Sequence, residues 1–118
     1  MSIRHQMRQR VEEYFKPVLE RFKEGNVKVY AIFVPKSGEI DEESIDVFER
    51  EVDLSNAESV EKFYSTLTKV ALENDVKELE LYGYAVENEG SLEVIAPNRN
   101  EEFEEIALEI IERMKEGA

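Results

Sequence analysis

Residues 27–34 read VKVYAIFV, and this stretch decides the fold. β-Branched and aromatic residues dominate it, and apolar side chains fall on both faces of an extended chain, which is typical of a central strand covered on both sides. Pro35 ends the strand because it has no amide hydrogen to donate, and residues 36–38 predict a turn. The remaining chain is expected to supply neighbouring strands and the helices that cover both faces.

An amphipathic helix is predicted before this strand, over residues 2–24. Gly25 and Asn26 end it, and Pro17 lies inside it, where the missing amide predicts a kink or a fresh helical start. We expect the part before Pro17 to lie partly outside the core. The apolar positions recur every three or four residues, as one helix face requires: Ile3, Met7, Val11, Tyr14, Phe15, Val18, Leu19 and Phe22.

Two segments follow the central strand. Residues 44–54 alternate in polarity but also fit helical spacing, and the alternation favours a strand antiparallel to residues 27–34. Ser55 and Glu58 form a capping-box pattern that predicts the start of a second helix, which ends near Asn74 and Asp75.

A hairpin and a third helix complete the chain. Residues 76–87 and 91–96 are predicted strands joined by a turn at residues 88–90, and Pro97 follows them. A helix begins after Asn98 or Asn100. Its apolar stripe is Phe103, Ile106, Ala107, Ile110, Ile111 and Met114.

The predicted element order is α-β-β-α-β-β-α within a single α+β domain that spans residues 1–118. Hairpins and short connections between successive strands predict a mostly antiparallel, four-stranded sheet with the helices packed on it.

The net charge of −13 is unevenly distributed along the chain. Residues 1–28 hold seven Lys or Arg and four Asp or Glu, a net of +3, whereas residues 29–118 hold eight and 24, a net of −16. A body this acidic repels phosphate backbones, which disfavours nucleic acid as a partner.

The composition also indicates a location and a chemistry. The absence of cysteine and of any long apolar run predicts a cytoplasmic protein without a membrane span or a thiolate metal site. The glutamate-rich chain with only two glutamines, Gln6 and Gln9, fits a thermophilic source as well as a mesophilic one. His5 is the single histidine and the five glycines stand apart, so we predict no catalytic residue, no cofactor and no metal.

Acidic and basic segments leave two functional alternatives. Residues 41–53 are rich in carboxylates and form the basis for a metal-dependent hydrolase or nuclease, although alternating acids also describe a solvated strand face. Arg4, Arg8 and Arg10 could contact an anion or the acids of a partner, which is the basis for a nucleic-acid-associated regulator.

Exposed apolar residues support the preferred hypothesis, a non-enzymatic protein-interaction or adaptor domain. Tyr82, Tyr84 and Val86 are predicted on one strand face, opposite Leu79 and Leu81, where they meet a partner, the N-terminal helix or a small molecule. We also expect a homodimer, in which two N-terminal helices meet through Ile3, Met7, Val11 and Tyr14.

Overall fold

The strand at residues 27–34 is central, as predicted. In the computed structural model, which describes residues 2–23, 25–38 and 40–117, β1 (Asn26–Pro35) pairs antiparallel with β2 on one side and β3 on the other. Within that part of the chain the sheet has four antiparallel strands in the order β2-β1-β3-β4. The remaining elements are α1 (Ile3–Arg21), the short 3-10 helix η1 (Glu42–Ser44), β2 (Asp46–Asp53), α2 (Ala57–Val76), β3 (Leu79–Asn88), β4 (Ser91–Ile95) and α3 (Glu101–Glu116).

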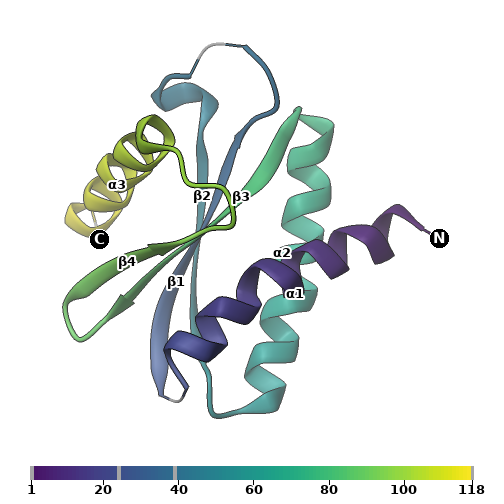
Figure 1. Cartoon of the computed structure of the whole chain (residues 1–118), viewed down its shortest axis with the longest axis vertical. Helices are drawn as coiled ribbons and strands as arrows, with labels where there is room; N and C mark the ends of the chain where they lie inside the picture. The colour runs from purple at the N-terminus through teal and green to yellow at the C-terminus, as the bar shows by residue number, and fades with distance from the viewer. Residues whose placement is uncertain (1, 24, 39, 118) are drawn as a thin grey trace.

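The helices form layers on both sides of the sheet (Figure 1). α1 and α2 cover one face and α3 covers the other, so each face has its own buried cluster. The α+β class and the predicted element order are confirmed. The alternation in residues 44–54 marks β2, and the helical alternative is wrong because Phe48 and Val52 of this edge strand pack on the α1/α2 side of the sheet while Val47 packs on the α3 side.

α1 is a continuous helix through Pro17, so the fresh start predicted there is wrong. The expectation that its first half lies outside the core is also wrong for Met7 and Val11, which are 8% and 0% exposed. The physical reason is that α2 lies beside α1, with Arg8 donating to Glu61 at 2.6 Å. Among the apolar positions predicted before Pro17, Ile3 is exposed, at 67%. The predicted helix end at residue 24 lies outside the described residues.

Local capping groups shift two predicted boundaries. α2 is capped by Asn56, whose side chain accepts hydrogen bonds from the amides of Glu58 and Ser59, whereas Ser55 bonds to Asp53 instead. The predicted Ser55 capping box is therefore wrong. Val76, predicted to begin a strand, is the last residue of α2. Asn100 caps α3, in agreement with one of the two predicted starts.

A β-bulge changes which side chains share a face of β3. Ile32 pairs with Gly83 and the next residue of β1, Phe33, pairs with Leu81, so Tyr82 is an extra residue in β3. Beyond the bulge, the side chains change sides relative to strict alternation. Gly83 is required there because a Cβ would lie 2.5 Å from the Cβ of Ala96.

Candidate functional site

The predicted tyrosine face does not exist. Because of the bulge, Tyr84 and Val86 lie with Leu81 on the side of α1 and α2, while Tyr82 lies on the side of α3. All three predicted interface residues are buried: Tyr82 is 7% exposed, and Tyr84 and Val86 are 0% exposed. Tyr84 and Val86 are therefore core residues and cannot contact a partner.

Tyr84 is held inside the core by a hydrogen bond to α1. Its hydroxyl donates to the carbonyl oxygen of Val11 at 2.8 Å, and its ring packs edge-on against Phe15 with centroids 5.2 Å apart. Burial raises the pKa of the Tyr84 phenol well above its ordinary value. This contact fixes the position of α1 on the sheet and explains why Val11 is not at an interface.

Two predicted interface residues, Tyr14 and Tyr82, line a cavity at the end of the sheet. The cavity has a volume of about 300 Å³ and lies between α1, the sheet and the connection from β4 to α3. Its apolar walls are Tyr14, Val34, Leu81, Tyr82, Pro97 and Phe103, and its polar walls are Glu80, Asn98, Arg99 and Asn100.

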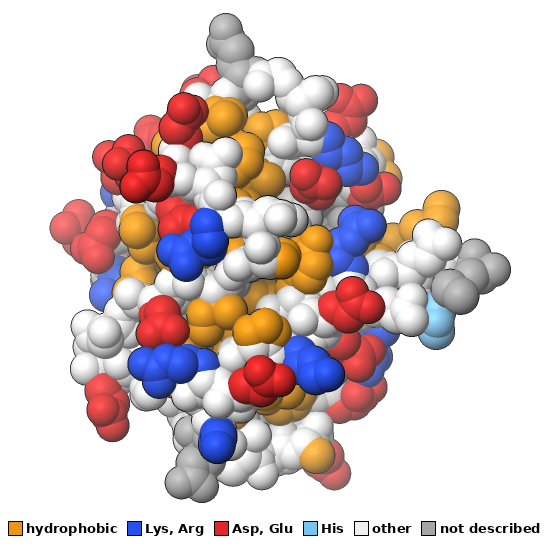
Figure 2. Space-filling model, viewed as in Figure 1, with side chains coloured by type: hydrophobic (Ala, Val, Ile, Leu, Met, Phe, Trp, Pro, Cys, Tyr) orange, Lys and Arg blue, Asp and Glu red, His pale blue; other side chains and the backbone are white. Residues whose placement is uncertain are grey.

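A second cavity of about 300 Å³ continues along the same helix. It is lined by Ile3, Gln6, Met7, Arg10, Lys36, Asp75 and Glu80, and Glu80 also lines the first cavity. The α1 residues of the two cavities, Ile3, Gln6, Met7, Arg10 and Tyr14, are spaced three, one, three and four residues apart, so they lie on one side of the helix. We call the two cavities together the α1 groove. Figure 2 shows hydrophobic side chains gathered across the middle of the face on which α1 lies in front.

A polar network anchors one wall of the α1 groove. Arg99 donates to both oxygens of Glu104, at 2.7 and 2.6 Å, and the Tyr82 hydroxyl also donates to Glu104. The amide of Asn100 donates to the Tyr82 oxygen at 2.7 Å. Arg99, followed by Tyr82, lowers the pKa of Glu104 to about 2, and burial together with the bond to Glu104 raises the pKa of Tyr82 to about 12. At neutral pH Glu104 is therefore ionised and Tyr82 is neutral, and their hydrogen bonds hold the connection before α3 against β3.

The three predicted arginines do not form one surface. Arg10 lines the α1 groove, whereas Arg4 and Arg8 line a cavity of about 260 Å³ on the other flank of α1, toward α2. Arg8 is engaged by Glu12 at 2.8 Å and by Glu61, which together raise its pKa, with Glu61 the larger cause. A continuous basic stripe of the kind that nucleic-acid binding favours is therefore absent from these three residues.

The carboxylates of residues 41–53 do not gather around one point, as a metal site would require. Asp41 uses its carboxylate to cap η1, accepting from the Ser44 amide at 2.9 Å, and the later acids follow the length of β2. Over residues 2–23, 25–38 and 40–117, no three His, Asp or Glu side chains lie close enough together to hold a metal ion.

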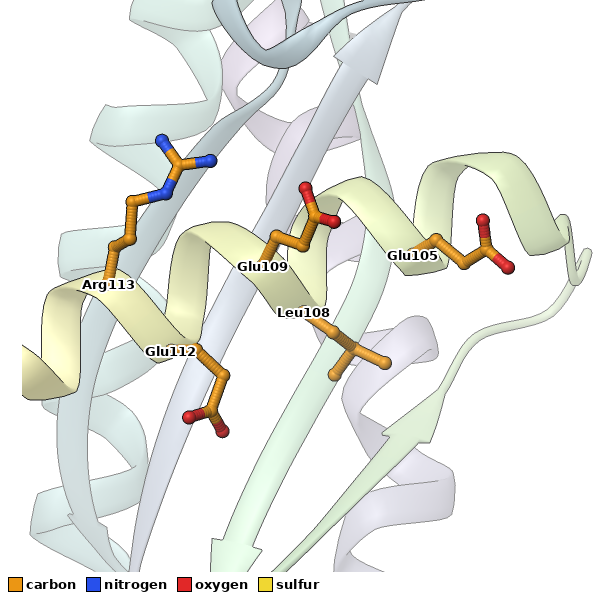
Figure 3. A pocket seen from close by; sticks show the side chains of 5 residues that line it. All are labelled: Glu105, Leu108, Glu109, Glu112 and Arg113. Carbon is orange, nitrogen blue, oxygen red and sulfur yellow. The ribbon is translucent and has the colours of Figure 1, made fainter.

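A shallow acidic surface lies on the outer side of α3. Figure 3 shows Leu108 and Glu112 projecting from one side of the helix and Glu109 and Arg113 from the opposite side, with Glu105 one turn earlier. All five residues come from α3; the four charged side chains are exposed, and Leu108 is half-buried against the α3-side core.

Comparison with known proteins gives one relative. A protein of Aquifex aeolicus (strain VF5), described as an uncharacterized protein, is 56% identical to this chain over 117 residues, which is 98% of each sequence. No family model and no solved structure matches the chain. None of the described helices is both long and apolar enough to cross a lipid bilayer.

Proposed function

The chain belongs to the same family as the Aquifex aeolicus protein, and we propose that it is a non-enzymatic, cytoplasmic protein-interaction domain that functions as a homodimer. The observation that carries this proposal is that the α1 groove has an exposed apolar residue, Ile3, at one end and an apolar cavity at the other. Of the dimer surface expected from the sequence, Ile3, Met7 and Tyr14 line this groove, whereas Val11 lies in the core of its own chain.

The apolar ends of the groove match each other in an antiparallel arrangement. Ile3 protrudes at one end, 67% exposed, and the aromatic cavity of Tyr14, Tyr82 and Phe103 lies at the other. The two ends are separated along α1 by about 16 Å, at 1.5 Å per residue. A two-fold axis between them would place Ile3 of each copy against the aromatic cavity of the other, which is the isologous contact of most small dimers.

The charges in the middle of the groove fit the same arrangement. Lys36 pairs with Asp75 within its own chain. Arg10 and Glu80 are both exposed, and neither has an ion-pair partner in the described part of the chain. In an antiparallel pair of copies, Arg10 of each copy would face Glu80 of the other, which gives the interface charge complementarity.

Sedimentation equilibrium at about 10–100 µM, a range in which a micromolar dimer is largely associated, tests the proposal. We expect a dimeric wild type and a monomeric Ile3→Asp variant. Gln9→Asp is the matched control, because it adds the same charge on the exposed, opposite side of α1 and should leave the dimer intact.

The ion pair is tested by exchanging its charges. Arg10→Glu and Glu80→Arg should each weaken the dimer, and the double variant should restore it at least in part. A monomeric wild type would refute the proposal. So would a dimer that Ile3→Asp leaves intact, because the contact would then lie on another surface.

A further inference from the structure

A cavity lies on the flank of α1 that faces α2, away from the α1 groove. It is lined by Ser2, Arg4, His5, Arg8, Ser65 and Thr68 and has a volume of about 260 Å³. We propose that this cavity, which we call the basic cavity, binds a small phosphate-bearing molecule.

The lining of the basic cavity is unusual for so acidic a chain. The protein has 28 Asp and Glu residues, yet none of the six residues that line this cavity is acidic. Four other cavities of the described chain each include at least one carboxylate. Two guanidinium groups, an imidazole and the hydroxyl groups of Ser2 and Ser65 offer hydrogen-bond donors here, which is the chemistry that a phosphate oxyanion requires. The Thr68 hydroxyl lines the cavity but already donates to the carbonyl oxygen of Tyr64 at 2.6 Å.

The contacts within the chain show which side chains of the basic cavity can bind a ligand. Arg8 is already fixed by Glu12 and Glu61, and its Nη1 donates to the Ser65 oxygen at 3.4 Å. The Ser65 hydroxyl proton therefore remains available to a ligand. Arg4 has no ion-pair partner in the described part of the chain, so its charge is the main attraction for an anion.

The neighbouring elements favour a small ligand over a nucleic acid. Glu12 and Glu61 border the cavity through Arg8, and residues 29–118 carry a net charge of −16, with eight Lys or Arg against 24 Asp or Glu. A polyanion that extended beyond the cavity would meet this acidic surface, whereas one or two phosphate groups would stay within the basic lining. A volume of about 260 Å³ also suits a small ligand.

The test is a titration of the full-length protein with pyrophosphate at constant ionic strength, followed by NMR of the backbone amides. We expect saturable shifts at Arg4, Ser65 and Thr68, with a dissociation constant of about 1 mM or lower. Arg4→Gln should weaken binding about tenfold or more, and Ser65→Ala should weaken it less. Lys16→Gln is the matched control, since it removes one exposed charge from the same helix outside the cavity.

Three results would overturn the proposal. One is the absence of saturable shifts up to about 10 mM pyrophosphate, ten times the expected dissociation constant. Another is an equal loss of affinity in Arg4→Gln and Lys16→Gln, which would show a diffuse electrostatic effect. The third is tighter binding of a short DNA duplex than of pyrophosphate at the same amides. Ile3→Ser, which removes the apolar contact on the other flank of α1 without adding a charge, should bind pyrophosphate as the wild type does, so failure of the dimer proposal is distinguishable from failure of this one.

Discussion

On one face of the sheet two helices enclose seventeen buried hydrophobic residues, whereas on the other face α3 encloses eight, in the described part of the chain. The first face contains an aromatic group in which Phe15 lies 4.8 Å from Phe63, 5.8 Å from Tyr64 and 5.2 Å from Tyr84, measured between ring centroids. The second has ten half-buried hydrophobic residues around its smaller core, against nine around the larger core of the first.

Polar groups enter the two faces differently. On the α1/α2 face the Tyr84 hydroxyl has a backbone partner, and the other rings around Phe15 pack against one another. On the α3 face the Tyr82 hydroxyl donates a hydrogen bond to Glu104. The hydroxyl of Tyr30, a residue that is 0% exposed, has no hydrogen-bond partner among the described residues. The comparison indicates that most of the packing energy lies on the α1/α2 face, while the α3 face depends more on its polar contacts.

The largest loss of stability should follow removal of the Phe15 ring. Phe15→Ala would leave a cavity among three aromatic neighbours and should lower the free energy of unfolding by about 3–5 kcal/mol. Ile111→Ala, at a residue that is also 0% exposed, should cost about 2–3 kcal/mol, because half-buried neighbours on the α3 face can move into the space. Urea unfolding of the two variants measures both. An equal or larger loss in Ile111→Ala would contradict the division between the faces.

Periodicity in the sequence predicted most of the fold. VKVYAIFV identified the central strand because both of its faces are apolar, and the stripe from Phe103 to Met114 identified α3. The bulge at Tyr82 could not be foreseen from alternation alone. Gly83 was the available signal, because an isolated glycine within a strand pattern marks a bulge or a close approach of another chain segment.

The candidate sites were less predictable than the fold. Four of the seven predicted interface residues line the α1 groove, namely Ile3, Met7, Tyr14 and Tyr82, but their grouping depends on how α1 crosses the sheet. The sequence also grouped Arg4, Arg8 and Arg10, which α1 separates onto two flanks. Ser65 and Thr68 were missed because only the packing of α2 beside α1 brings them to Arg8.

Disrupting the polar network of the α3 face should lower stability by an intermediate amount that depends on pH. The pKa of Glu104 is lowered from 4.5 to about 2, so its contribution to stability is present above pH 4.5 and is lost as the pH falls toward 2. Glu104→Gln should therefore reduce stability by about 1–3 kcal/mol at neutral pH, and the difference from wild type should shrink between pH 4.5 and 2.

Thermal unfolding from pH 7 to pH 2 measures this difference. Glu105→Gln is the control, because Glu105 is an exposed neighbour on α3 and should leave the pH dependence unchanged. A Glu104→Gln variant with the same pH profile as the wild type would show that Arg99 and Tyr82 do not hold the carboxylate in solution.

The smallest effect should be at Tyr30, and its sign distinguishes the two faces. Burial, and then the charges of Glu49, Glu87 and Glu112, raise the pKa of Tyr30 to about 12, so its hydroxyl is neutral at any ordinary pH. Tyr30→Phe removes a buried polar atom that has no hydrogen-bond partner among the described residues, and it should leave the free energy of unfolding unchanged or raise it by up to about 1 kcal/mol.

Tyr84→Phe is the counterpart on the α1/α2 face. It removes the hydrogen bond to the Val11 carbonyl oxygen and should lower the free energy of unfolding by about 1 kcal/mol. Thermal melts of the two variants make the comparison. A loss in Tyr30→Phe as large as that in Tyr84→Phe would mean that the Tyr30 hydroxyl is hydrogen-bonded in solution, and that the α3 face is satisfied as fully as the other.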